Sequence, residues 1–150
     1  LNQIIKTCFM KNKSLVAADN CFVCGTNNPI GLKLKFELKE GNCVSSFTPT
    51  ENHVGFYDIV HGGILFTVLD DAMANWFYLQ GMVGYTARSE IRFKQHLKVG
   101  ETALISCYLE NRRGNLLLLK GHMINSETKK IIAESEGKFL IEKTSQQNQS

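Results

Sequence analysis

Two adjacent acids inside a long apolar segment are the residues of this chain best placed to do chemistry. Asp70 and Asp71 lie in the sequence VHGGILFTVLDDAMANW, residues 60–76. On a helix with about 100° per residue, Asp71 shares a face with Thr67 and Asn75, whereas Asp70 has mainly apolar neighbours. Burying a carboxylate in such surroundings costs several kcal/mol unless it is paired or used. We therefore expect Asp70 to be the functional acid, with an ion pair to an arginine of a facing sheet as the alternative. Asp71 is expected to be solvated or hydrogen-bonded.

Two glycines precede this segment and could act as an oxyanion hole. Gly62 and Gly63 follow His61 at the expected helix N-terminus, where the first amide N–H groups are unpaired and carry partial positive charge. Because glycine has no side chain, a ligand carbonyl can approach these amides closely. A tight turn is the alternative explanation for the glycines. His61 is expected to cap the helix entrance or pack there rather than act as a base.

The spacing of these groups predicts an oligomer. Gly62 and Asp70 are eight residues apart, which corresponds to about 12 Å along a helix. One helix therefore cannot place its N-terminus and its own Asp70 on the same carbonyl. Two antiparallel helices related by a two-fold axis could, each lending its N-terminus to the other's aspartate. We expect a homodimer with two composite sites, which two dimers could extend to a tetramer.

The elements around the helix predict an α+β domain. Strict alternation of apolar and polar residues makes 32–38 a half-buried strand, and strand-like segments also cover 42–48, 83–95, 101–110, 115–124 and 130–142. Consecutive strands with short loops pair antiparallel, and a helix that is apolar on nearly every side must be engulfed. We expect a single domain over residues 1–150, with its core at about 20–142. A curved antiparallel sheet of five or six strands would surround one central helix, after a short helix within residues 1–20 and before a frayed polar tail.

Composition excludes several classes of function. The formal net charge is only +3 with no long basic run, so we expect no nucleic-acid partner. No apolar stretch approaches about 18 uncharged residues, so we expect no membrane span. Five cysteines are an odd number, and the N-terminal residues lack the apolar segment of a secretory signal. Reduced thiols and a cytoplasmic location are therefore expected.

One pair of cysteines has the spacing of half a metal site. Cys21-Phe-Val-Cys24 would suit a zinc ion or a redox pair. Zinc needs two further ligands, and the sequence has no second CxxC and no HxxxH. We therefore expect no metal and interpret the cysteines as small buried side chains beside the loop GTNNPIG. A zinc-stabilised interaction module is the alternative.

The helix motif resembles that of the hotdog-fold thioesterases. VHGGILFTVLDDAMANW is similar to the motif of the PaaI-like branch of the 4-hydroxybenzoyl-CoA thioesterase superfamily, and CFVCGTNNPIGL (residues 21–32) resembles an N-terminal signature of a subset of that branch. Tyr85-Thr86-Ala87, ahead of Val99-Gly100-Glu101, matches the next strand and turn of the family. The resemblance covers about residues 20–142. It implies a hotdog fold and hydrolysis of an acyl-CoA, with coenzyme A as part of the substrate and no cofactor.

The resemblance also implies roles for three residues. In that family an aspartate is the base or nucleophile, a glycine amide binds the carbonyl oxygen, and a serine or threonine helps to position water; here these are Asp70, Gly62 and Thr86. Thr86 is expected on the polar face of its strand with Arg88, and an ordinary outward threonine is the alternative. The chain departs from the family twice. Val54 and Gly55 replace an asparagine or glutamine, for which His53 is the candidate substitute, and Gln95-His96 replaces the usual Arg-Pro or Ser-Pro.

The remaining candidates would bind substrate. Phe66, Met73 and Phe77 are expected beside an acyl slot, and Arg112 and Arg113 at a hairpin tip could meet coenzyme A phosphates. A solvated turn is the alternative for the two arginines. The rival functions are a non-catalytic acyl-CoA-binding protein and a hotdog hydratase or dehydratase, although the HFPG-like signature of the latter enzymes is missing.

Overall fold

A computed structural model of the chain describes residues 18–142. Most of the helix expected within residues 1–20, and the polar tail, therefore lie outside the described residues. The elements follow the predicted order of strands, one helix and more strands: β1 (Glu37–Lys39), β2 (Asn42–Phe47), the 3₁₀ turn η1 (Glu51–His53), β3 (Val54–Phe56), β4 (Ile59–Val60), α2 (Gly62–Tyr78), β5 (Gly84–Phe93), β6 (Ala103–Arg113), β7 (Leu116–Asn125) and β8 (Ile131–Ile141).

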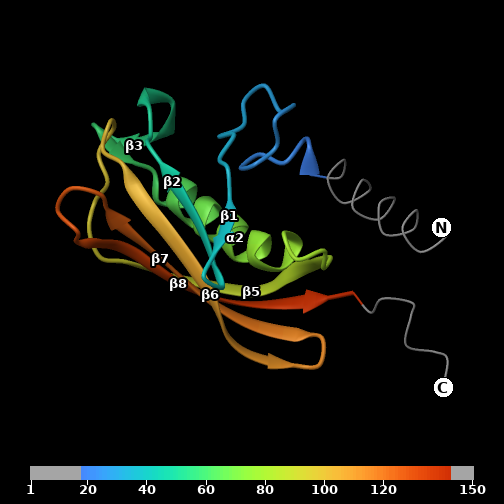
Figure 1. Cartoon of the computed structure of the whole chain (residues 1–150). Helices are drawn as coiled ribbons and strands as arrows, with labels where there is room; N and C mark the ends of the chain where they lie inside the picture. The colour runs from blue at the N-terminus through green and yellow to red at the C-terminus, as the bar shows by residue number, and fades with distance from the viewer. Residues whose placement is uncertain (1–17, 143–150) are drawn as a thin grey trace, which may run out of the picture.

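The main feature is a six-stranded sheet with every neighbouring pair antiparallel, in the order β1-β2-β6-β7-β8-β5. Figure 1 shows this twisted sheet curving around α2, which packs against β2, β5, β6, β7 and β8. The predicted α+β class, with one antiparallel sheet around one helix, is confirmed. β5 forms one edge of the sheet and lies against the helix.

Glycines in the sheet let the helix approach closely. A Cβ at Gly121 would lie 2.7 Å from Cys107 Sγ and 3.4 Å from a Leu69 methyl. A Cβ at Gly137 would lie 3.1 Å from the end of the Met73 side chain. These two sheet positions therefore accept only glycine without displacing side chains of the core. The apolar stripe of α2 fills the space instead, through Leu65, Val68, Leu69, Ala72, Met73 and Phe77.

The prediction of a strand at 32–38 is largely wrong, because the strand that joins the sheet, β1, covers only Glu37–Lys39. Leu32 and Leu34 donate instead to the carbonyls of Phe22 and Val23 in the preceding loop. The alternation still marks the correct side chains, since Leu32, Leu34 and Phe36 pack against the core. A period of two indicates which side is buried, but it does not identify the backbone partner.

Two further points complete the architecture. The short hairpin of β3 and β4, which the sequence pattern did not predict, comes directly before the helix. Within the part of the chain that is described, no helix is long and apolar enough to cross a membrane.

Candidate active site

His61 caps helix α2, as expected. Its backbone is extended, with φ −60° and ψ 131°, and its Nδ1 accepts the N–H of Gly63 at 2.9 Å. Since Nδ1 is an acceptor, the neutral ring carries its proton on Nε2. The cap satisfies one of the unpaired amides at the helix start.

Only one of the two glycines is left to serve as an oxyanion donor. The Gly63 amide, expected to be the second donor, is already bound by His61. The Gly62 amide has no hydrogen-bond partner among residues 18–142. A Cβ at Gly62 would lie 3.2 Å from the Phe93 ring, and a Cβ at Gly63 would lie 2.9 Å from His61 Nδ1. Each glycine therefore makes room for a neighbouring ring, and Gly62 leaves one free donor.

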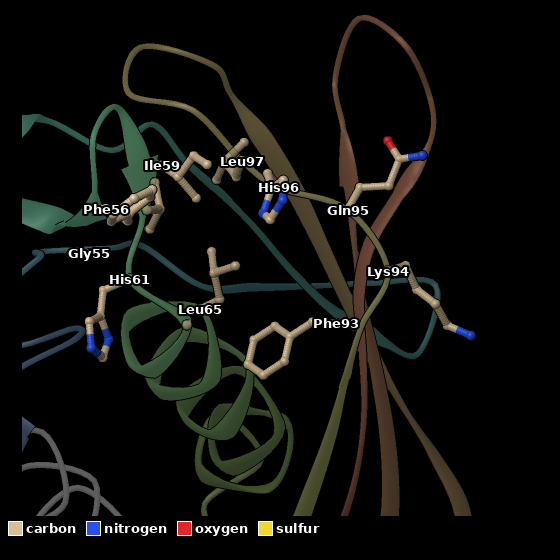
Figure 2. Close-up of a pocket in the computed structure, with 12 residues that line it drawn as sticks. Gly55, Phe56, Ile59, His61, Leu65, Phe93, Lys94, Gln95, His96 and Leu97 are labelled. Carbon is tan, nitrogen blue, oxygen red and sulfur yellow. The ribbon is translucent and has the colours of Figure 1, made fainter.

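The free amide belongs to a cavity of about 730 Å³ at the helix N-terminus. Its walls come from the β3–β4 hairpin, the first turn of α2 and the segment after β5, namely Gly55, Phe56, Ile59, Val60, His61, Gly62, Leu65, Phe93, Lys94, Gln95, His96 and Leu97. Figure 2 shows the His96 imidazole pointing towards the start of the helix, while Lys94 and Gln95 point away. In the sequence His96 stands out only as a departure from the family pattern, which does not indicate that it lines this cavity.

His53 has a structural role that differs from the expected one. Its Nδ1 accepts the Thr50 N–H at 2.9 Å, and its carbonyl accepts the His61 N–H at 2.9 Å. The ring packs against Phe47, with centroids 5.5 Å apart. His53 is not among the residues that line the cavity at the helix N-terminus. It supports the segment that leads into His61.

Asp70 is paired with Thr86, as the resemblance implied. The Thr86 hydroxyl donates to the carboxylate, at 3.1 Å from Oδ1 and 3.3 Å from Oδ2. Burial raises the pKa of Asp70, and the hydrogen bond from Thr86 partly opposes that rise. The alternative of an ion pair is not observed, since Asp70 forms none within residues 18–142. The carboxylate is thus more basic than a free aspartate and has a hydroxyl beside it.

A β-bulge brings Thr86 to the helix. Thr86 lies opposite the buried Phe139, whereas Arg88 lies opposite the exposed Lys138, so one extra residue, Ala87, sits between them. Paired residues of an antiparallel ladder point to the same side. Thr86 therefore points to the helix side and Arg88 to the outer side. The prediction that they share one polar face is wrong, because a bulge reverses the alternation.

A second cavity, of about 470 Å³, surrounds Asp70. Its walls are Val23, Phe66, Thr67, Asp70, Asp71, Thr86, Ala87, Arg88 and Ser89. Ser89 Oγ is buried and has no hydrogen-bond partner among the described residues. It is a further polar atom at this site that the sequence pattern did not indicate.

Phe66, Met73 and Phe77, all expected beside an acyl slot, lie in two different environments in the structure. Phe66 lines the Asp70 cavity. Met73 and Phe77 are core residues instead, 0% and 1% exposed, and Phe77 packs on Phe139 with ring centroids 5.5 Å apart. The sheet covers the side of α2 that carries Met73 and Phe77. The helix wheel alone could therefore not distinguish residues of an acyl-binding slot from residues of the hydrophobic core.

Arg112 and Arg113 are exposed near the tip of the β6–β7 hairpin and line neither cavity. Arg112 Nε donates to the Gly114 carbonyl at 3.1 Å, which is a turn contact. Their location matches the solvated turn that was the alternative to phosphate binding.

The two cavities have no lining residue in common. Gly62 faces one, and Asp70 with Thr86 faces the other. As the helix spacing predicted, a single chain does not place the free amide and the carboxylate at one point.

Helix α2, its capped N-terminus and the curved antiparallel sheet define the class of hotdog proteins. The profile of the Thioesterase superfamily (4HBT) matches residues 57–132, just over half of the chain. The chain belongs to this superfamily. The match does not include residues 21–32, so the N-terminal signature stays a prediction.

Comparison with individual proteins agrees with this assignment. The chain is 26% identical over 114 residues to the acyl-coenzyme A thioesterase THEM5 of Mus musculus, covering 76% of this chain and 46% of that protein. It therefore spans about half the length of that relative. The PaaI protein from the phenylacetic acid degradation operon of E. coli has the same fold, with a TM-score of 0.74 and 20% identity over 89% of this chain and 96% of that one. The smu.793 protein of Streptococcus mutans, solved bound to acetyl CoA, has a TM-score of 0.67 and 18% identity over 73% of this chain and 88% of that one.

Proposed function

We propose that this protein is an acyl-CoA thioesterase, which hydrolyses an acyl-CoA to the free acid and coenzyme A. The observation that carries the proposal is the hydrogen-bonded pair of Asp70 and Thr86 in a cavity beside the helix. Membership of the thioesterase superfamily and the likeness to a mouse acyl-CoA thioesterase support the reaction class. The acetyl CoA bound by the S. mutans protein supports the substrate class.

The proposed mechanism uses groups of the chain alone. Asp70, made more basic by burial, takes a proton from a water molecule that the Thr86 hydroxyl oxygen holds in place. The hydroxide adds to the thioester carbon, and the Gly62 amide donates a hydrogen bond to the carbonyl oxygen, on which negative charge develops. The carbon–sulfur bond then breaks, and the coenzyme A thiolate takes the proton back from Asp70. Direct attack by the Asp70 carboxylate, followed by hydrolysis of the anhydride, is the variant of this mechanism.

Two copies of the chain would complete the site. The separation of Gly62 from Asp70 into different cavities supports a homodimer in which each subunit lends its helix N-terminus to the partner. β5 supports it as well, because this ten-residue edge strand pairs only with β8 among the described residues. A long open edge offers its free backbone groups to another strand. Pairing along β5 would bring two copies of the Thr86 region together, and two such dimers could form the predicted tetramer.

The same arrangement suggests how the substrate is bound. The acyl group would enter beside Phe66 in the Asp70 cavity. His96 replaces His53 as the candidate for a second group on the thioester carbonyl, since it lines the cavity of the Gly62 amide. Arg112 and Arg113 remain candidates only for a distal phosphate contact, because they lie outside both cavities.

The proposal is tested with a panel of acyl-CoAs of different chain length and aromatic character, measured by release of free thiol. We expect turnover by the wild-type chain and its loss in Asp70→Asn. Binding without thiol release would favour the non-catalytic acyl-CoA-binding protein. Consumption of an enoyl-CoA without thiol release would favour the hydratase. A chain that neither binds nor cleaves any member of the panel would contradict the proposal.

A further inference from the structure

Three metal-binding side chains meet beside the cavity of Asp70, and the proposed thioester chemistry uses none of them. The sulfur atoms of Cys21 and Cys24 and a carboxylate oxygen of Asp71 lie within 4.8 Å of one another. The cysteines come from the loop before β1 and the aspartate from helix α2. All three residues are half-buried. The third ligand that CxxC lacked in the sequence is therefore supplied from 47 positions further along the chain.

We propose that Cys21, Cys24 and Asp71 bind one zinc ion, which fastens the N-terminal loop to helix α2. Zinc accepts thiolate and carboxylate ligands in tetrahedral geometry at about 2.0–2.3 Å, which places the ligand atoms about 3.5 Å apart. The three atoms need only a small closure to reach that spacing. A water molecule completes the four ligands. Two thiolates select against magnesium and calcium, which prefer oxygen ligands.

The loop holds Cys21 in a conformation that suits a metal ligand. The N–H groups of Val23 and Cys24 both point at Cys21 Sγ, at 3.4 and 3.5 Å. These two contacts hold the sulfur at a fixed place in the turn. Gly25 closes this turn, because a Cβ there would lie 2.4 Å from the backbone nitrogen of Cys21. The sequence CxxCG therefore builds the turn before any ion binds.

Asn75 orients the third ligand. Its Nδ2 donates to Asp71 Oδ2 at 3.0 Å and to the Asp71 carbonyl at 2.9 Å, and it lies 3.8 Å from Cys24 Sγ. The other carboxylate oxygen, Oδ1, faces Cys21 Sγ at 3.5 Å. The carboxylate is thus held by one oxygen and offers the other to the sulfur atoms. A carboxylate that binds a metal through one oxygen usually accepts a hydrogen bond on its other oxygen.

Charge balance favours a divalent cation at this site. Asp71 forms no ion pair within residues 18–142. Without metal, the thiol of Cys21 donates a hydrogen bond to Asp71 Oδ1. A zinc ion that binds both sulfurs displaces two protons. The site with zinc, two thiolates and a carboxylate has the same net charge as the carboxylate with two thiols, so the exchange adds no charge to a half-buried place.

The ion would act next to the candidate active site without taking part in it. Val23, between the two cysteines, and the ligand Asp71 both line the cavity of Asp70. A zinc ion would hold this part of the cavity wall against α2.

The proposal is tested on the full chain with its thiols reduced. After incubation with zinc and removal of the excess, we expect about one zinc per chain by elemental mass spectrometry. Cobalt in place of zinc should give the visible absorption of a tetrahedral ion and a thiolate-to-cobalt charge-transfer band. Titration in weak buffer should release about two protons per zinc at neutral pH. These readouts are independent of thioesterase activity, so the failure of one proposal is distinguishable from the failure of the other.

Variants separate this site from a chance contact. Cys24→Ser and Asp71→Asn should each raise the Kd for zinc at least about tenfold. Loss of a residue that only supports a metal ligand already costs about that much, and loss of a ligand should cost no less. Asp70→Asn is the matched control, because it changes the adjacent acid and should bind zinc like the wild type. If Cys24→Ser does not fold, Asp71→Asn carries the test, since its amide keeps the shape of the side chain. A reduced wild-type chain that takes up no zinc, a cobalt spectrum without the charge-transfer band, or unchanged affinity in Asp71→Asn would each overturn the proposal.

Discussion

At the scale of single residues, the two neighbouring acids have different surroundings and should respond differently to the same change. Both acids line the same cavity, but Asp70 accepts a hydrogen bond from Thr86, whereas Asp71 accepts one from Asn75 and lies beside two cysteines. Asp70→Asn should lower kcat at least about 100-fold, which is the usual contribution of a general base. Asp71→Asn should change kcat only slightly when zinc is absent from both proteins. Thiol release and circular dichroism of both variants check this, and an equal loss of turnover in the two would contradict the assignment.

The Thr86 hydroxyl provides a second contrast at this scale. Thr86→Val keeps the branched shape but removes the donor to Asp70, so kcat should fall about tenfold or more, as expected for a hydrogen bond to a charged group. Thr86→Ser keeps the donor and should retain most of the activity. Steady-state kinetics of the pair measures the effect. If valine and serine gave the same rate, the hydroxyl would have no role beside Asp70.

Some of this residue chemistry could be predicted from the sequence and some could not. The helix wheel predicted that Asp71 lies beside Asn75, because a regular helix fixes which neighbours lie three and four residues away, whereas the catalytic role of Asp70 stays a prediction. The prediction that Thr86 shares a face of β5 with Arg88 was wrong. A single inserted residue reverses which side every later residue of the strand points to, and the sequence pattern does not show it. The meeting of Asp71 with Cys21 and Cys24 depends on a loop crossing a helix, which no local spacing encodes.

At the scale of elements, the N-terminus of α2 is set by one side chain. His61 Nδ1 accepts the Gly63 amide and so stabilises the first turn. His61→Ala should lower the free energy of unfolding by about 1 kcal/mol, the usual value of a helix N-cap, and the Tm by about 2–4 °C for a chain of this size. His61→Asn keeps an acceptor at the same place and should restore most of the loss. Thermal unfolding of the three proteins checks the prediction, and equal Tm values for alanine and wild type would refute the cap.

The elements were easier to predict than their partners. Strands β2, β5, β6, β7 and β8 and helix α2 all lie where turns and hydrophobic periodicity placed them. The segment 32–38 shows the limit, because Leu32 and Leu34 bury their side chains while their amides bond to a loop. The hairpin of β3 and β4 was missed because strands of two and three residues are too short to show an alternation of apolar and polar residues. It nevertheless supplies a wall of the cavity at Gly62.

For the whole molecule, the position of Gly62 and Asp70 in two different cavities predicts that each active site uses the amide of one chain and the carboxylate of another. Gly62 is the first residue of α2, and His61 before it is extended. Proline is favoured at the first helical position, and an extended residue is what proline prefers before it. Gly62→Pro should therefore fold while removing the free amide, and its kcat should fall at least about 100-fold, as for loss of one oxyanion donor. Gly62→Ala is the matched control: it makes the same contact with Phe93, 3.2 Å from the added Cβ, but keeps the N–H and should stay active.

Mixing inactive subunits then tests whether two chains share one site. When Asp70→Asn and Gly62→Pro exchange subunits, a mixed dimer has one site with both defects and one site with an intact amide and an intact aspartate. Activity should return to about half of the wild-type value per mixed dimer, or about a quarter in an equal mixture with random exchange. Sizing and circular dichroism of each variant establish that both fold and assemble, and mass spectrometry under native conditions counts the mixed dimers. If mixed dimers form and the mixture stays inactive, the amide and the carboxylate do not act on one carbonyl across the interface, and the roles proposed for Gly62 and Asp70 must be given up together.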